Sequence, residues 1–122
     1  MVVSAMADLS ETRSPAPGAS RDDEARREAI RALLAGGLKT EVEPRADDEG
    51  MFREIVDRLR SAGGDLTTKL AIAGFTPEKV DHGGLEQACE SCMYYQVHRR
   101  YCELPELDFP VEPEWSCRLW RI

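Results

Sequence analysis

Residues 89–122 read CESCMYYQVHRRYCELPELDFPVEPEWSCRLWRI, and this stretch holds every cysteine of the 122-residue chain. The thiols stand at Cys89, Cys92, Cys102 and Cys117, which gives the spacing C-x2-C-x9-C-x14-C. Two cysteines three positions apart can direct both sulfurs at one point from a single turn, whereas the other two must arrive from separate loops. The pattern predicts one shared four-thiolate metal site rather than four unrelated core cysteines.

The same segment is rich in proline and aromatic residues. Pro105, Pro110 and Pro113 lie between the third and fourth cysteines and exclude a helix there. We therefore expect an irregular, loop-rich segment that returns its last thiolate to the site. Six of the eight aromatic side chains of the chain also fall here, and they predict a dry wall around the metal. A low dielectric disfavours the more negatively charged state of a cluster.

The spacing leaves two kinds of metal open. Four cysteine thiolates are the usual ligands of [2Fe–2S] and [4Fe–4S] clusters, but they also form structural zinc sites. Structural zinc sites usually bring a second close pair of cysteines, whereas Cys102 and Cys117 are single and widely spaced. We therefore expect an iron–sulfur cluster, with a zinc ion as the alternative. His98 could replace one thiolate, although the four cysteines already suffice.

The cysteine segment resembles the high-potential iron–sulfur proteins. The resemblance lies in the C-x2-C pair, in the third cysteine followed closely by Leu104-Pro105, and in a valine and a tryptophan shortly before the last cysteine. An aromatic residue, Trp120, also stands three positions after the last cysteine. The resemblance implies that each of the four cysteines ligates one iron of a [4Fe–4S] cluster. The side chains that it implies as cluster shields are Tyr94, Trp115 and Trp120.

The N-terminal part of the chain predicts little packed structure. Residues 1–20 are rich in Ala, Ser, Pro and Gly and are expected to form a disordered lead. Residues 21–35 predict a helix that Gly36-Gly37 ends, with a narrow apolar stripe that packs either on its own domain or on a partner. Residues 39–50 are polar and without pattern. Residues 21–50 are therefore expected to be a detached helix followed by a polar linker.

Residues 51–122 are expected to form the folded domain. Apolar residues recur at helical spacing from Met51 until Gly63-Gly64, with Asp47 or Asp48 as a cap, and a second helix opens at Asp65 and closes at Gly74. Thr76-Pro77 predicts a further short helical turn, which Gly83-Gly84 ends. The fold class is thus a small α-rich domain with an irregular, loop-rich iron–sulfur segment at its C-terminal end and a disordered N-terminus.

Charge and composition narrow the function. The net charge of −7 argues against a nucleic-acid binder and favours a basic protein partner. No apolar run approaches a membrane span and no leader is visible, so a cytoplasmic protein is expected, where clustered cysteines are more often ligands than disulfides. Arg99 and Arg100 either neutralise the cluster or donate hydrogen bonds near its sulfurs, or they form a plain solvated basic turn; the sequence favours neither.

The sequence therefore predicts one-electron transfer through a single [4Fe–4S] cluster. The chain would act as a small subunit or partner of a larger oxidoreductase. It would not be an enzyme by itself and would have no small-molecule substrate. The alternative is a zinc-stabilised protein–protein interaction module.

Overall fold

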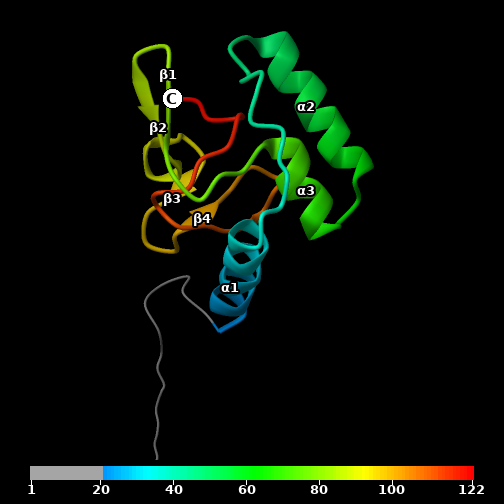
Figure 1. Cartoon of the computed structure of the whole chain (residues 1–122), viewed down its shortest axis with the longest axis vertical. Helices are drawn as coiled ribbons and strands as arrows, with labels where there is room; N and C mark the ends of the chain where they lie inside the picture. Colours follow the sequence, from blue (N-terminus) through cyan, green and yellow to red (C-terminus); the bar gives the residue numbers. More distant parts are fainter. Residues whose placement is uncertain (1–20) are drawn as a thin grey trace, which may run out of the picture.

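The computed structural model describes residues 21–122, so the disordered lead predicted for residues 1–20 lies outside the described residues. The described part contains three α-helices and two small antiparallel sheets, as Figure 1 shows. The helices are α1 (Arg21–Ala35), α2 (Glu49–Ser61) and α3 (Leu66–Ala73), with a 3₁₀ turn η1 (Cys89–Ser91). The strands are β1 (Val80–His82), β2 (Leu85–Gln87), β3 (Tyr95–Gln96), β4 (Tyr101–Cys102) and β5 (Phe109–Pro110).

The two central helices begin and end where the sequence predicts. The Asp48 carboxylate accepts a hydrogen bond from the Met51 N–H at 2.8 Å and caps α2, and Asp65 caps α3 in the same way through the Thr68 N–H at 3.0 Å. Gly74 ends α3 with φ of 71°, a left-handed conformation that favours glycine. These capping interactions confirm both predicted helices.

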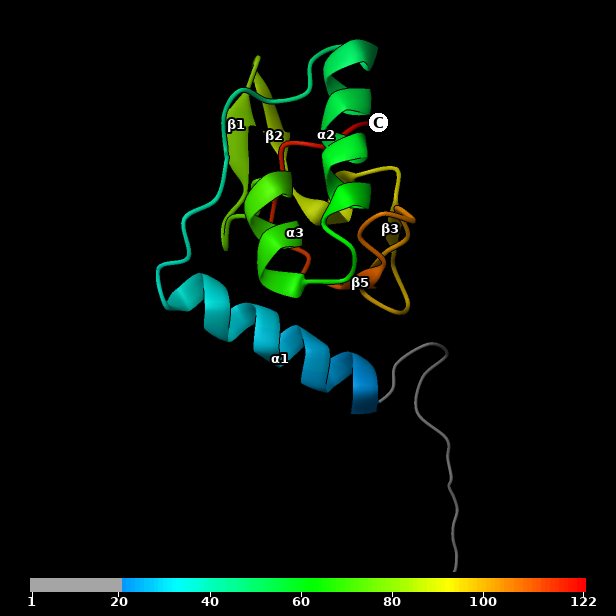
Figure 2. The ribbon, with the colours of Figure 1, turned by 90° about the vertical axis from the view of Figure 1, so that its right-hand side faces the viewer.

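Helix α1 is part of the same core rather than detached. Ile30 and Leu34 are buried among the core residues, and α1 lies against β5. The buried Arg27 donates to the carbonyl oxygens of Val111 at 3.0 Å and Arg100 at 2.9 Å. Figure 2 shows α1 lying beneath α3 and strand β5. The narrow apolar stripe is sufficient to hold α1 because these arginine hydrogen bonds supply part of the attachment. A search for hydrophobic periodicity cannot detect such contacts.

The segment predicted as a polar linker is packed as well. Residues 38–48, here called the strap, run from α1 past α3 to the start of α2 (Figures 1 and 2). The Glu41 N–H donates to the Ala71 oxygen at 2.8 Å, and the Ala46 N–H donates to the Arg118 oxygen at 2.9 Å. Within the strap, Arg45 is only 2% exposed. The strap thus fastens the helices to the C-terminal end of the chain.

The short helical turn predicted at Thr76-Pro77 is wrong. Thr76 instead forms an isolated antiparallel bridge with Ser116, with N–H to oxygen distances of 2.9 and 3.1 Å. The chain then enters the β1–β2 hairpin, whose turn is Gly83-Gly84 with φ of 61° and 81°. Two successive positive φ values match the turn that suits a two-residue hairpin. The glycine pair therefore reverses a strand instead of ending a helix.

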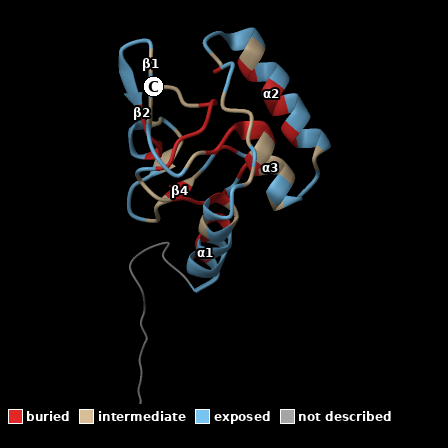
Figure 3. Cartoon of the chain, in the orientation of Figure 1, coloured by how far each residue is buried: buried red, intermediate tan, exposed pale blue. Residues whose placement is uncertain are grey.

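The core lies between the helices and the C-terminal segment, as the buried residues in Figure 3 show. Phe75 follows α3 and packs edge-on against Phe109 of β5, with ring centroids 5.3 Å apart. Strand β4 is the centre of the order β3-β4-β5, and it pairs Cys102 with Tyr95 on one side and Phe109 on the other. Among residues 21–122, no helix has the length and apolar character to cross a membrane.

Candidate metal centre

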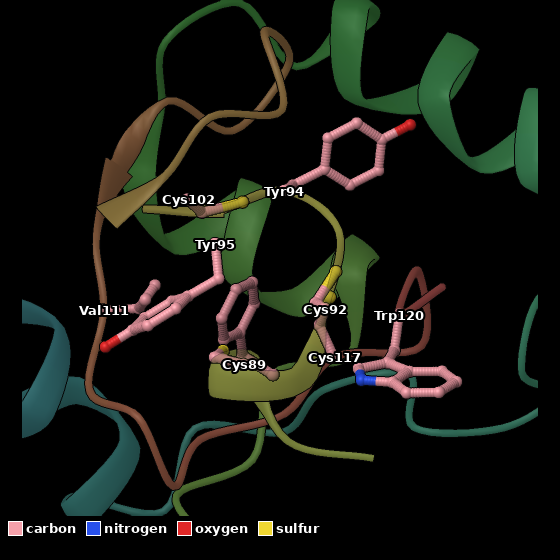
Figure 4. Close-up of a pocket in the computed structure, with 9 residues that line it drawn as sticks. Cys89, Cys92, Tyr94, Tyr95, Cys102, Val111, Cys117 and Trp120 are labelled. Atoms are coloured by element: carbon pink, nitrogen blue, oxygen red, sulfur yellow. The ribbon is translucent and has the colours of Figure 1, made fainter. Parts of the chain in front are cut away.

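All four cysteines line one cavity. Figure 4 shows their side chains around it, and the cavity has a volume of about 20 Å³, enough for about one water molecule. The surface that the cavity presents is apolar. Its remaining walls are Phe75, Tyr94, Tyr95, Val111 and Trp120. The fold therefore brings together thiols from separate segments, as the cysteine spacing predicts.

The C-x2-C pair is held by η1 and by the C-terminal segment. The turn closes with the Cys92 N–H donating to the Cys89 oxygen at 3.1 Å. The Cys89 N–H donates to the Trp115 oxygen at 2.6 Å, and the Met93 N–H donates to the Arg121 oxygen at 2.8 Å. Cys117 stands between these two anchor points. Backbone pairing, rather than a helix, thus returns the fourth thiol to the first two.

The third and fourth cysteines share a local geometry. Each is followed two positions later by leucine, and the backbone N–H of Leu104 donates to the Cys102 sulfur as that of Leu119 donates to the Cys117 sulfur. Both hydrogen bonds lower the pKa of the thiol they reach. Backbone donors aimed at sulfur stabilise thiolates and tune the potential of thiolate-bound clusters.

Burial nevertheless keeps the metal-free thiols protonated. Burial, with a smaller contribution from the nearby thiols, raises the pKa of Cys89 and Cys102 well above the ordinary value and that of Cys117 to about 12. Each of the three is therefore close enough to other cysteines for their charges to interact. Four thiolates in this cavity repel one another unless a metal holds them.

These shifts predict a pH dependence for the metal-free protein. The unfolded thiol titrates near pH 9, whereas folded Cys117 keeps its proton until a pH of about 12. Between these values the unfolded chain binds fewer protons than the folded chain, so stability falls as pH rises. We expect the urea midpoint of the metal-free protein to drop between pH 9 and pH 10.5. The metal-loaded protein, whose thiols are already deprotonated, should show no such drop.

The arginines that act on the cysteines differ from Arg99 and Arg100, the two that the sequence suggests. Arg99 forms a two-pronged ion pair with Asp23 at 2.8 and 3.0 Å, and Arg100 pairs with Glu112 at 2.9 Å. Arg45 and Arg118 instead lower the pKa of Cys117. Sequence reasoning missed Arg45 because it reaches the site only through the strap, and it overlooked Arg118 although that residue directly follows Cys117.

The predicted shields are only partly at the cavity. Tyr94 and Trp120 line it, whereas Trp115 is buried, at 2% exposed, without being a lining residue. Phe75 was not predicted, since nothing in its sequence context separates it from other core residues. His98 is exposed and does not line the cavity, so the cysteines alone supply the donors there.

The four cysteines line the same cavity, yet the structure does not place them as a ready-made ligand set. Within residues 21–122, no three histidine, cysteine or acidic side chains are grouped so as to hold a metal ion. The donor set is thus four thiols spread around a shared space.

Comparisons with known proteins add no relative. No protein-family model matches the chain, and no match was found among curated proteins or solved structures. The resemblance of the cysteine segment to high-potential iron–sulfur proteins therefore stays a prediction from its motif. The proposals that follow depend on this chain's own residues.

Proposed function

We propose that Cys89, Cys92, Cys102 and Cys117 hold one [4Fe–4S] cluster and that the protein transfers single electrons. The observation that carries the proposal is that all four cysteines of the chain line one apolar cavity. A shared cavity allows the four thiols to bind one metal centre, which scattered core cysteines could not do.

The spacing of the cysteines favours a cluster over a single ion. Zinc in a tetrahedral four-cysteine site requires every sulfur at roughly 2.3 Å from one point. The described residues contain no three cysteine, histidine or acidic side chains grouped to hold a metal ion, so the preference for a cluster rests on the sequence, in which Cys102 and Cys117 are single and widely spaced. A zinc-stabilised interaction module remains the second candidate, and the metal content decides between the two.

The cavity walls support a redox role. A bound cluster would supply one-electron chemistry. The side chains around it exclude water and lower the local dielectric, which disfavours the more negatively charged cluster states. We therefore propose a high-potential couple, in which the resting cluster gives up an electron to an oxidant instead of accepting a further one.

Trp120 is the proposed contact with a redox partner. It is half-buried, lines the cavity and also lines a surface groove that contains Asp47, Asp48 and Glu49. Arg121 and His82 also line this groove and lie 2.8 Å from Glu49 and Asp47, respectively. The net charge of −7, rather than the groove itself, therefore favours a partner with basic side chains at its electron-accepting surface. The partner would be a larger oxidoreductase, with this chain contributing no substrate chemistry.

The test is the metal content and visible absorption of the protein purified without air. We expect a brown protein with about four irons and four sulfides per chain, which bleaches reversibly on redox cycling. A colourless protein with one zinc per chain would overturn the cluster and leave the interaction module. A protein with no bound metal would overturn both.

A further inference from the structure

Arg45 is a buried cation whose four hydrogen bonds all go to neutral groups. Its Nε donates to the Gln87 side-chain oxygen at 2.7 Å, and its Nη2 donates to the Ser116 hydroxyl at 3.0 Å and the Cys117 carbonyl at 2.5 Å. Its Nη1 donates to the Val42 carbonyl at 3.4 Å. The guanidinium thus joins the strap, strand β2 and the segment that carries the fourth cysteine.

The other two buried arginines of residues 21–122 have carboxylate partners, and Arg45 does not. Arg27 pairs with Glu24, and Arg118 pairs with Glu41 at 3.1 Å. No carboxylate of the described residues lies within 4.0 Å of the Arg45 nitrogens. An isolated buried charge is strongly disfavoured, so a guanidinium in this position needs an opposite charge from another source.

The cysteine site is the strongest source of that charge. Burial lowers the pKa of Arg45, and Cys117 opposes this effect more than any other charged group does. The two residues are also directly hydrogen-bonded through the Cys117 carbonyl. A centre held by four thiolates carries net negative charge, whereas four neutral thiols would leave Arg45 only the smaller compensation from Glu43 and Asp47.

We infer that Arg45 is the built-in counter-charge of the cysteine centre, a positioning residue that stabilises its negative charge from behind Cys117. The inference rests on the proposed metal site but applies to any metal that keeps the thiolates ionised. A fixed positive charge at this place favours the more reduced state of a cluster and strengthens metal binding. This positive charge partly offsets the apolar walls, which disfavour the more negatively charged states of the cluster.

A structural role for Arg45 makes a different prediction. If its hydrogen bonds alone mattered, neutralising the charge while keeping the bonds would leave the reduction potential unchanged. Gln87→Glu does this, because the new carboxylate has the shape of the amide and accepts the same bond from Nε. The surface residue Gln96 offers the matched control, since Gln96→Glu adds the same charge in an exposed position where solvent screens it.

The experiment is a redox titration of the purified cluster protein and four variants. We expect Gln87→Glu and Arg45→Gln to lower the reduction potential, and Arg45→Lys and Gln96→Glu to stay near the wild-type value. Gln87→Glu keeps the inference testable if Arg45→Gln fails to fold. An unchanged potential in Gln87→Glu, or an equal shift in Arg45→Lys and Arg45→Gln, would overturn it.

Metal analysis separates this inference from the proposed function. If the protein binds iron but Gln87→Glu leaves the reduction potential unchanged, the counter-charge inference is wrong and the proposed cluster is supported. With zinc bound instead of iron, the cluster fails, and the counter-charge is measured as zinc affinity: about tenfold weaker in Gln87→Glu and unchanged in Gln96→Glu. With no metal bound, both fail, because no ionised thiolates then face Arg45.

Discussion

Replacing Cys117 with serine is expected to abolish cluster binding and to destabilise the whole folded region. In the proposed centre the thiolate is a ligand of the metal, and a serine hydroxyl is a poor substitute for a soft thiolate donor. Cys117 also links the two halves of the site, since its flanks pair with both Thr76 and the C-x2-C turn. Metal binding and folding are coupled in so small a core, so loss of the metal removes stability as well.

The four serine variants should differ in their metal-free stability. Cys89 and Cys117 are 8% and 9% exposed, whereas Cys92 and Cys102 are half-buried. A hydroxyl placed in a buried apolar site without a partner costs about 1–3 kcal/mol. We therefore expect the substitutions at Cys89 and Cys117 to lower the unfolding free energy of the metal-free protein more than those at Cys92 and Cys102.

Iron content and urea unfolding of the four variants check this expectation. Met93→Ser is the matched control, because Met93 follows Cys92 directly but is 59% exposed. It should keep the full metal content and the wild-type urea midpoint. Any serine variant at a cysteine that keeps both would show that its thiol is not a ligand, and the shared site would be wrong for that residue.

Local signals explain what could be predicted of the fold. The caps at Asp48 and Asp65 and the left-handed Gly74 are properties of a few neighbouring residues, and the structure confirms the helices that they define. The Gly83-Gly84 pair failed as a signal because two left-handed residues suit a hairpin turn as well as a break. Strands of two or three residues are too short for an alternating pattern to identify.

Long-range polar contacts explain what could not be predicted. The strap looks like a linker because its sequence is charged, yet Arg45 is buried by partners 42 and 71 residues away in the chain. Helix α1 looks detached for the same reason, since Arg27 reaches carbonyl groups 84 and 73 residues away. A search for hydrophobic periodicity cannot detect an arginine that donates hydrogen bonds to distant carbonyl oxygens.

The same contrast between local signals and long-range contacts applies to the cysteine site. The cysteines could be named because their spacing is itself the signal, and the structure places all four at one cavity. The walls and the charge depend on the tertiary fold: Phe75 comes from the end of α3, and Arg45 comes from the strap. Trp115 shows the limit of motif reasoning, because its backbone oxygen anchors Cys89 while its ring does not line the cavity.

Gly74→Ala is expected to have the largest effect of any substitution remote from the cysteines. Gly74 has φ of 71°, and an alanine Cβ would overlap the Glu41 carbonyl oxygen and lie 2.9 Å from its carbonyl carbon. Both atoms belong to backbone of the strap, which cannot move aside without breaking the hydrogen bond from Glu41 N–H to Ala71. Left-handed strain of about 1–2 kcal/mol therefore adds to a clash.

Gly63→Ala separates the clash from the strain. Gly63 has nearly the same φ, 72°, but no atom lies within 4 Å of the added Cβ. We expect it to lower the unfolding free energy by about 1 kcal/mol and Gly74→Ala by more than about 3 kcal/mol. Because the strap also places Arg45 behind Cys117, only Gly74→Ala should weaken metal binding as well. Equal urea midpoints for the two variants would mean that the strap does not press against α3, and the placement of Arg45 would lose its support.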